Sequence, residues 1–128
     1  MSRVTANVDS LRDFELHAIH LMADDVLTPE QFVALHKLVT PANYEYTGCG
    51  YYLTVRNPSL PEQERTVSVP VVGRADDIVC GFLLFLGNNE LTLECHTWGP
   101  VEVPADFRDR AVRVDFPDPG SFVRLSNR

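Results

Sequence analysis

Glu94, His96 and Trp98 alternate along the sequence, and they are the residues whose types and spacing best suit chemistry. Alternate residues of a strand share one face, so a carboxylate, an imidazole and an indole would stand side by side. A carboxylate next to an imidazole can serve as an acid–base pair, and an indole can anchor a ligand or a partner. The simpler interpretation is a polar patch at the end of a sheet, with Trp98 capping the core.

Cys49 lies between two glycines, and its thiolate would be a nucleophile if a base or a positive field stood nearby. Free cysteines in strands are more often small buried hydrophobic residues. If His96 reaches Cys49 in space, then Glu94, His96 and Cys49 line a pocket for a small molecule. This pocket is the alternative function that we carry forward, and we assign no catalytic residue.

Asp13, His17, His20 and Asp24 are spaced by 4, 3 and 4 residues, which places all four on one stripe of a helix. Two imidazoles one turn apart can share a metal ion, and carboxylates can complete the site. A solvated helix face with Asp–His pairs explains the same spacing. We keep His17 and His20 as secondary metal candidates, and we predict no metal or other cofactor.

The sequence lacks the common signatures of enzymes. It contains neither GxGxxG nor GxxxxGK, which cradle phosphates, and it contains no GxSxG elbow, HExxH pair or EF-hand loop. Their absence favours a protein that is not an enzyme.

The chain is acidic, with a formal net charge of -7 and a pI of about 4.9. A protein that binds nucleic acid needs excess Lys and Arg to replace phosphate counterions, and a protein that binds an anionic membrane surface needs the same excess. The acidic composition therefore argues against nucleic acid and membrane as partners. Residues 9–45 hold seven acidic residues against two basic ones, a net of -5. We therefore expect a basic protein partner, contacted by four carboxylates with an aromatic anchor: Asp13, Asp24, Asp25, Glu30 and Trp98.

No part of the sequence resembles a signal peptide, and no apolar run reaches the ~20 residues that span a bilayer. The three cysteines show no metal or disulfide spacing. Both observations predict a cytoplasmic protein with free thiols.

Two helices are predicted near the start of the chain. Residues 1–8 form a loose terminus, and apolar residues from Leu11 recur with a helical period to about Asp24, although 14–22 also alternates as a strand would. Thr28, Pro29 and Gln31 form a capping box with proline at the first helical position. The second helix then runs to about Val39, which completes a helical region over 10–39.

The rest of the chain, residues 44–125, alternates as strands do, and the hairpin 80–98 is its centre. Further strands are predicted over 44–55, 65–72, 111–116 and 122–125, with a turn over 73–77 and a short helical turn over 104–110. Pro70 makes the strand over 65–72 an edge strand or ends it early. Asn88 and Asn89 tolerate the positive φ of a tight turn. This turn pairs Phe82 with Cys95 and Leu84 with Leu93. Because 82–86 is apolar on both faces, we expect the hairpin to be covered on both sides.

The pattern predicts one α+β domain over 1–128, with two N-terminal helices packed on a mostly antiparallel sheet of about five strands. In size, charge and order of elements the chain is similar to many bacterial immunity and antitoxin-type proteins. That analogy implies a non-enzymatic protein that binds a basic partner. A homodimer, formed through a sheet edge or a helix face, is the third function that the sequence leaves open.

Overall fold

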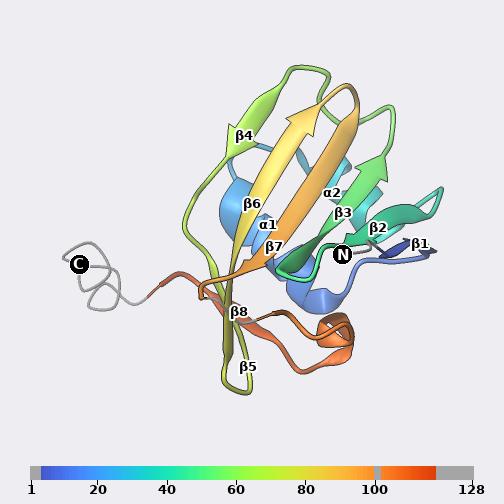
Figure 1. Cartoon of the computed structure of the whole chain (residues 1–128). Helices are drawn as coiled ribbons and strands as arrows, with labels where there is room; N and C mark the ends of the chain where they lie inside the picture. Colours follow the sequence, from blue (N-terminus) through green and yellow to red (C-terminus); the bar gives the residue numbers. More distant parts are fainter. Residues whose placement is uncertain (1–3, 100–101, 118–128) are drawn as a thin grey trace.

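A computed structural model of the chain describes residues 4–99 and 102–117. Two helices and eight strands make up this part, together with one 3₁₀ turn, Phe107–Asp109 (Figure 1). In chain order they are β1 (Val4–Val8), α1 (Asp13–Ala23), α2 (Pro29–His36), β2 (Ala42–Tyr46), β3 (Gly50–Arg56), β4 (Arg65–Val67), β5 (Val72–Ala75), β6 (Ile78–Gly87), β7 (Glu90–Thr97) and β8 (Arg113–Asp115).

The strands form one antiparallel sheet in the order β1-β2-β3-β7-β6-β5-β8. β6 has ten residues, and β7 pairs along most of one of its sides. The other side is shared, because β4 pairs with residues 84–86 of β6 and β5 pairs with residues 78–81. The two strands β7 and β6 are therefore the centre of the sheet.

The β6–β7 hairpin has the predicted turn and register. Asn88 and Asn89 have φ angles of 54° and 59°, the left-handed conformation that asparagine tolerates better than most residues. Phe82 pairs with Cys95 and Leu84 pairs with Leu93. The local sequence is sufficient for this result, since a two-residue turn fixes the register of both strands.

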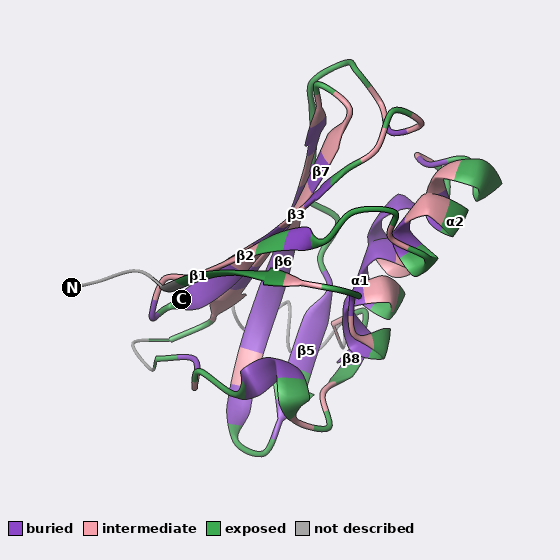
Figure 2. Ribbon diagram, turned by 90° about the vertical axis from the view of Figure 1, so that its right-hand side faces the viewer, coloured by how far each residue is buried: buried purple, intermediate pink, exposed green. Residues whose placement is uncertain are grey.

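Both helices pack on the same face of the sheet (Figure 2). Their buried residues include Phe14, Ile19, Met22 and Leu35, and they meet inward residues of the central strands such as Leu93. The predicted second cover is wrong: neither helix lies over the other face, where Leu83 and Phe85 are only partly buried. The apolar run of β6 reflects one buried face and one half-exposed face, instead of two layers of cover.

The sheet is larger than predicted, with eight strands instead of about five. The expected loose terminus contains β1, which pairs with β2 from Val4↔Tyr46 to Val8↔Ala42. The helices therefore follow a strand and do not open the fold. The polar residues of β1 gave no apolar alternation, because an edge strand can be exposed on most of its surface.

Three predicted boundaries are also corrected. The stretch 44–55 is two strands, because Gly48 adopts φ 89° and reverses the chain between β2 and β3. The second helix is capped by Thr28 and Gln31 as predicted, but it ends at His36, and Val39 is 84% exposed. The strand predicted over 65–72 ends early, at Val67, before Pro70, which has no N–H to donate. β5 begins at Val72 and runs to Ala75, into the stretch 73–77 that was predicted as a turn.

The fold is thus α+β with a large antiparallel sheet. β8 lies within the strand predicted over 111–116, and the 3₁₀ turn lies within the helical turn predicted over 104–110. The strand predicted at 122–125 falls outside the described residues.

Candidate functional site

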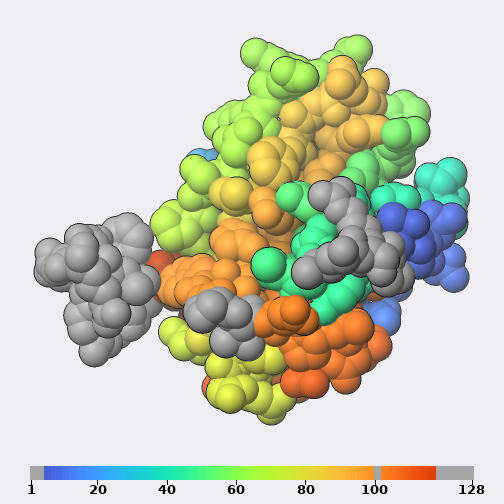
Figure 3. Space-filling view, viewed as in Figure 1, coloured from blue at the N-terminus to red at the C-terminus, as the bar shows by residue number. Residues whose placement is uncertain are grey.

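The sheet face opposite the helices is the candidate site, and we call it the open face. This face is toward the viewer in Figures 1 and 3, and it carries the outward residues of the three central strands, which are partly buried. They are Tyr52 and Thr54 of β3, Leu83 and Phe85 of β6, and Thr92, Glu94 and His96 of β7. Trp98 follows β7 directly and is 41% exposed.

Strand register arranges these side chains in rows across the sheet. One row runs Tyr52, Glu94, Leu83 and the next runs Thr54, Thr92, Phe85. The two threonine hydroxyls hydrogen-bond to each other, with 3.0 Å between their Oγ1 atoms. The centre of the open face is thus a mixed surface of aromatic, aliphatic and hydroxyl groups, with one carboxylate in the middle.

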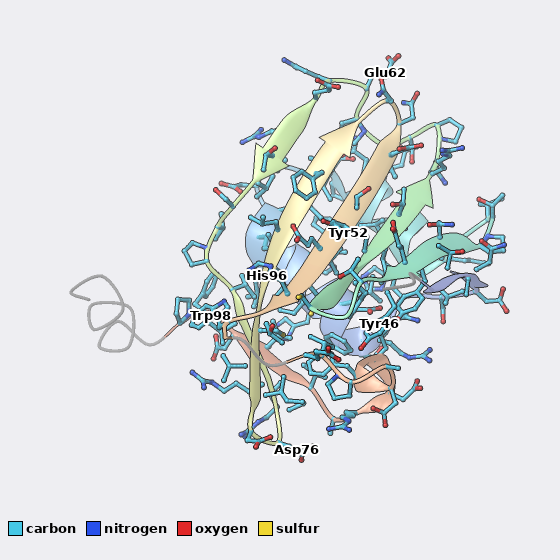
Figure 4. All side chains as sticks on the ribbon, viewed as in Figure 1. Tyr46, Tyr52, Glu62, Asp76, His96 and Trp98 are labelled. Carbon is cyan, nitrogen blue, oxygen red and sulfur yellow. The ribbon has the colours of Figure 1, made fainter. Side chains whose placement is uncertain are left out.

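Gly81 makes room for the ring of Trp98. A Cβ at this position would lie 2.4 Å from Trp98 Nε1 and 3.1 Å from His96 Nε2, so both rings occupy the space over the glycine. Figure 4 shows Tyr52, His96 and Trp98 spread across this side of the sheet. His96 Nδ1 is shielded from solvent and has no hydrogen-bond partner in the described part of the chain. Packing around Gly81, and not a hydrogen bond to this nitrogen, therefore holds the imidazole.

The pocket predicted from Glu94, His96 and Cys49 is only partly assembled. Glu94 and His96 share the open face, as alternation requires. Cys49 is exposed in the turn before β3, where its backbone carbonyl accepts a hydrogen bond from Thr97 N at 3.0 Å. Among the described residues, no hydrogen bond or ion pair joins any two of these three side chains. Nothing in the geometry shows a shared acid–base site.

The predicted acidic contact residues do not lie beside Trp98. Asp24 and Asp25 follow α1, Glu30 lies in the first turn of α2, and all three are exposed on the helical side. Asp13 begins α1, about 16 Å from Asp24 along a helix of this length. Trp98 lies over Gly81 on the opposite side of the sheet (Figure 4). A single flat partner surface cannot contact all five residues at once.

The two histidines predicted as metal candidates, His17 and His20, have different surroundings. His20 meets His36 of α2, with 3.0 Å between the Nε2 atoms, and it stacks on Phe32. His17 takes no part in this contact. Desolvation first, and then the neighbouring His36, lower the pKa of His20, while Asp24 raises it. No group of three or more His, Cys, Asp or Glu side chains in the described ranges could hold a metal ion.

Sequence reasoning missed a buried ion pair between Glu15 and Arg108. Arg108 donates from Nε to Glu15 Oε2 at 2.7 Å and from Nη2 to Oε1 at 2.8 Å. Tyr51 Oη donates to Oε2 at 2.6 Å, and Arg12 N donates to Oε1 at 2.7 Å. Burial and the Glu15 charge raise the pKa of Tyr51 well above its usual range. No local signal exists for this cluster, since Glu15 and Arg108 are 93 residues apart.

A hollow of about 270 Å³ lies over the end of β6, between its neighbours β4 and β7, at one end of the open face. Phe85, Thr66 and Thr92 form part of its wall, and Glu64 and Glu90 contribute carboxylates. Arg65 also lines it. The hollow combines an aromatic ring with acidic groups, which suits a cationic side chain better than an anionic one.

Comparison of the chain with protein-family models, with curated proteins and with solved structures gives no match. Within the described residues, neither helix is long and apolar enough to cross a membrane. The function must therefore be argued from the geometry of the open face.

Proposed function

We propose that the protein is a non-enzymatic binding protein that docks a basic protein partner on its open face. The observation that carries this proposal is that, in the described part of the chain, both helices cover one side of the large sheet and neither covers the other (Figures 1 and 2). Tyr52, Leu83 and Phe85 lie at the centre of the uncovered side. Partly exposed aromatic and aliphatic groups, surrounded by polar ones, are the composition of a protein interface.

The charge of the central strands on the open face supports a basic partner. Glu45, Glu90 and Glu94 lie there, against Arg56, which pairs with Glu90. By strand register Arg74 and Arg113 lie on the same side of the sheet, at its β5–β8 edge, so the acidic part of the face is its centre and the end near Glu90. The chain as a whole carries -7, so a basic protein would be attracted over a distance of about a Debye length. In this arrangement Asp24, Asp25 and Glu30 accelerate association by their field, without touching the partner.

The hollow at the end of the open face would receive one Lys or Arg side chain of the partner. The ring of Phe85 offers a cation–π surface and Glu64 offers a carboxylate. Glu90 is already paired with Arg56, so the partner's cation would share its carboxylate with that arginine. Trp98, at the other end of the face, would be the aromatic anchor. The predicted anchor is therefore kept, and the other contact residues on its side of the sheet become Tyr52 and Phe85 instead of the acidic residues of the helices.

The test is a quantitative pull-down from the native cytoplasm with matched variants. Phe85→Ser removes a central residue of the open face, and Val33→Ser removes an exposed residue of α2, which is 64% exposed on the other side of the molecule. We expect a basic protein, bound in stoichiometric amount, to be retained by the wild type and by Val33→Ser but lost by Phe85→Ser. Circular dichroism confirms that both variants fold.

Salt and self-association provide the deciding controls. Retention of the partner should fall as salt rises, because the attraction is electrostatic. A partner that both variants retain equally would refute the open face as the interface. Recovery of only a second copy of the same chain would replace the proposal with a homodimer.

A further inference from the structure

His20 and His36 bring two ring nitrogens together at the surface of the helical layer. His20 lies in the last turn of α1 and His36 is the last residue of α2. Their Nε2 atoms are 3.0 Å apart, so one nitrogen carries the hydrogen and the other offers its lone pair. The two residues are 16 positions apart in sequence, and only the packing of the two helices makes them neighbours.

The position of the His20 ring is fixed by its surroundings. It stacks on Phe32, with 3.9 Å between ring centroids and 9° between planes. His36 is exposed and its ring is inclined by 60° to that of His20. One imidazole is thus held in place while the other can adjust, and solvent ions have access to both.

The spacing of the two nitrogens matches a particular coordination geometry. At metal–nitrogen distances of about 2.0–2.1 Å, a separation of 3.0 Å between the nitrogens corresponds to an angle of about 90° at the metal. That is the angle between adjacent ligands of octahedral or square-planar ions. A tetrahedral ion would need about 3.4 Å, so the exposed His36 ring would have to move to bind one.

We propose that His20 and His36 form a binding site for a divalent transition-metal ion of octahedral or square-planar preference, of the Ni²⁺ or Cu²⁺ class. Both Nε2 atoms coordinate the ion, and the ring that donates in the metal-free pair moves its proton to Nδ1. Water fills the other positions, since the described residues supply no third side chain already in place. Asp24, one turn after His20 on α1, is the nearest carboxylate along the helix and favours a cation there.

This site is distinct from the one that sequence spacing suggested. His17 lies one turn before His20 and also lowers the pKa of His20, more weakly than His36 does. It lines a different cavity, between α1 and the β5–β8 edge. His17 is therefore a matched control: it has the same residue type, lies on the same helix and is exposed.

The experiment is a calorimetric titration of the full chain with NiCl₂ alone. The wild type and His17→Gln should bind one ion with the same affinity. His20→Gln and His36→Gln should each weaken binding by about tenfold or more, because loss of an outer-shell partner alone costs that much. Circular dichroism of each variant shows that it is folded.

A spectroscopic measurement identifies the ligands independently of affinity. With CuCl₂ alone, electron paramagnetic resonance of the wild type should show coupling to two imidazole nitrogens, and that of His36→Gln to one. Wild-type affinity in both His20→Gln and His36→Gln would overturn the proposal. Loss of binding in His17→Gln would assign the ion to the other pair on α1 and overturn it as well.

Discussion

Glu15 is a carboxylate with no exposed surface, in contrast to its helix neighbour Asp13. Four hydrogen bonds reach its two oxygens, and two of them come from the guanidinium of Arg108. A buried carboxylate is tolerated only when its lone pairs are occupied in this way. The cluster ties α1 to β3 and to the 3₁₀ turn, so its role is to orient the helical layer on the sheet.

Removal of the arginine should be costly. We expect Arg108→Met to lower the free energy of unfolding by about 3–5 kcal/mol, because it leaves Glu15 buried without its cationic partner. Arg12→Met is the control, since the Arg12–Asp109 pair is 42% and 66% exposed and such pairs contribute about 0–1 kcal/mol. Urea denaturation measures both. Equal, small losses in the two variants would contradict a structural role for the buried pair.

Tyr51 should make the protein sensitive to alkali. Its pKa is raised, first by burial and then by Glu15, so the folded phenol stays protonated while the unfolded one ionises near pH 10. Its contribution to stability is complete below that pH and declines above it, by up to about 1.4 kcal/mol per pH unit. Unfolding of Tyr51→Phe should show a shallower decline above pH 10 than the wild type, and parallel curves would contradict this.

At the scale of elements, the hairpin could be predicted and the cover of its faces could not. Asn88, Asn89 and the alternation of β7 determine the turn and register locally. Whether Leu83 and Phe85 meet a second layer depends on where the rest of the chain goes, and period-two patterning carries no such information. Alternation along one strand was enough to place Glu94 and His96 on one face. The contacts His20–His36 and Glu15–Arg108 could not be predicted, because they depend on how distant elements pack.

Short strands were missed, as β1 was, or given the wrong bounds, as β4 and β5 were, for a different physical reason. β1 is an edge strand whose residues Thr5, Ala6 and Asn7 are exposed, so burial imposes no alternation on its sequence. β4 and β5 have only three and four residues, and their pairing depends on the length of β6. Elements that obtain their stability from a neighbouring strand leave little trace in their own residues.

Gly81 should control the position of Trp98 at the end of β7. Gly81→Ala would push a Cβ against the indole, so we expect Trp98 to become more exposed. Trp98 is the only tryptophan, and its fluorescence emission should shift to longer wavelength. Gly99→Ala is the control, because a Cβ there meets nothing within 4 Å among the described atoms. An unchanged spectrum in Gly81→Ala would show that the indole does not rest on the glycine.

At the scale of the molecule, the helical layer and the sheet differ in how their backbone groups are protected. β7 has β3 on one side and β6 on the other along nearly its whole length. β1 has a described partner on one side only, and α2 has eight residues with two of them buried. Amide groups paired on both sides and covered by a core open only with global unfolding, whereas edges and short helices open locally.

Hydrogen exchange followed by mass spectrometry should therefore rank the elements. Peptides from β7, β6 and β3 should exchange most slowly, and those from β1 and α2 should exchange faster by orders of magnitude. The outcome also bears on self-association, because a second copy pairing along β1 would protect its free edge. Slow exchange in β1 that becomes fast on dilution would show that two copies pair along β1. Slow exchange in β1 at every concentration would contradict the expected ranking, because β1 would then be more stable than its exposed residues imply.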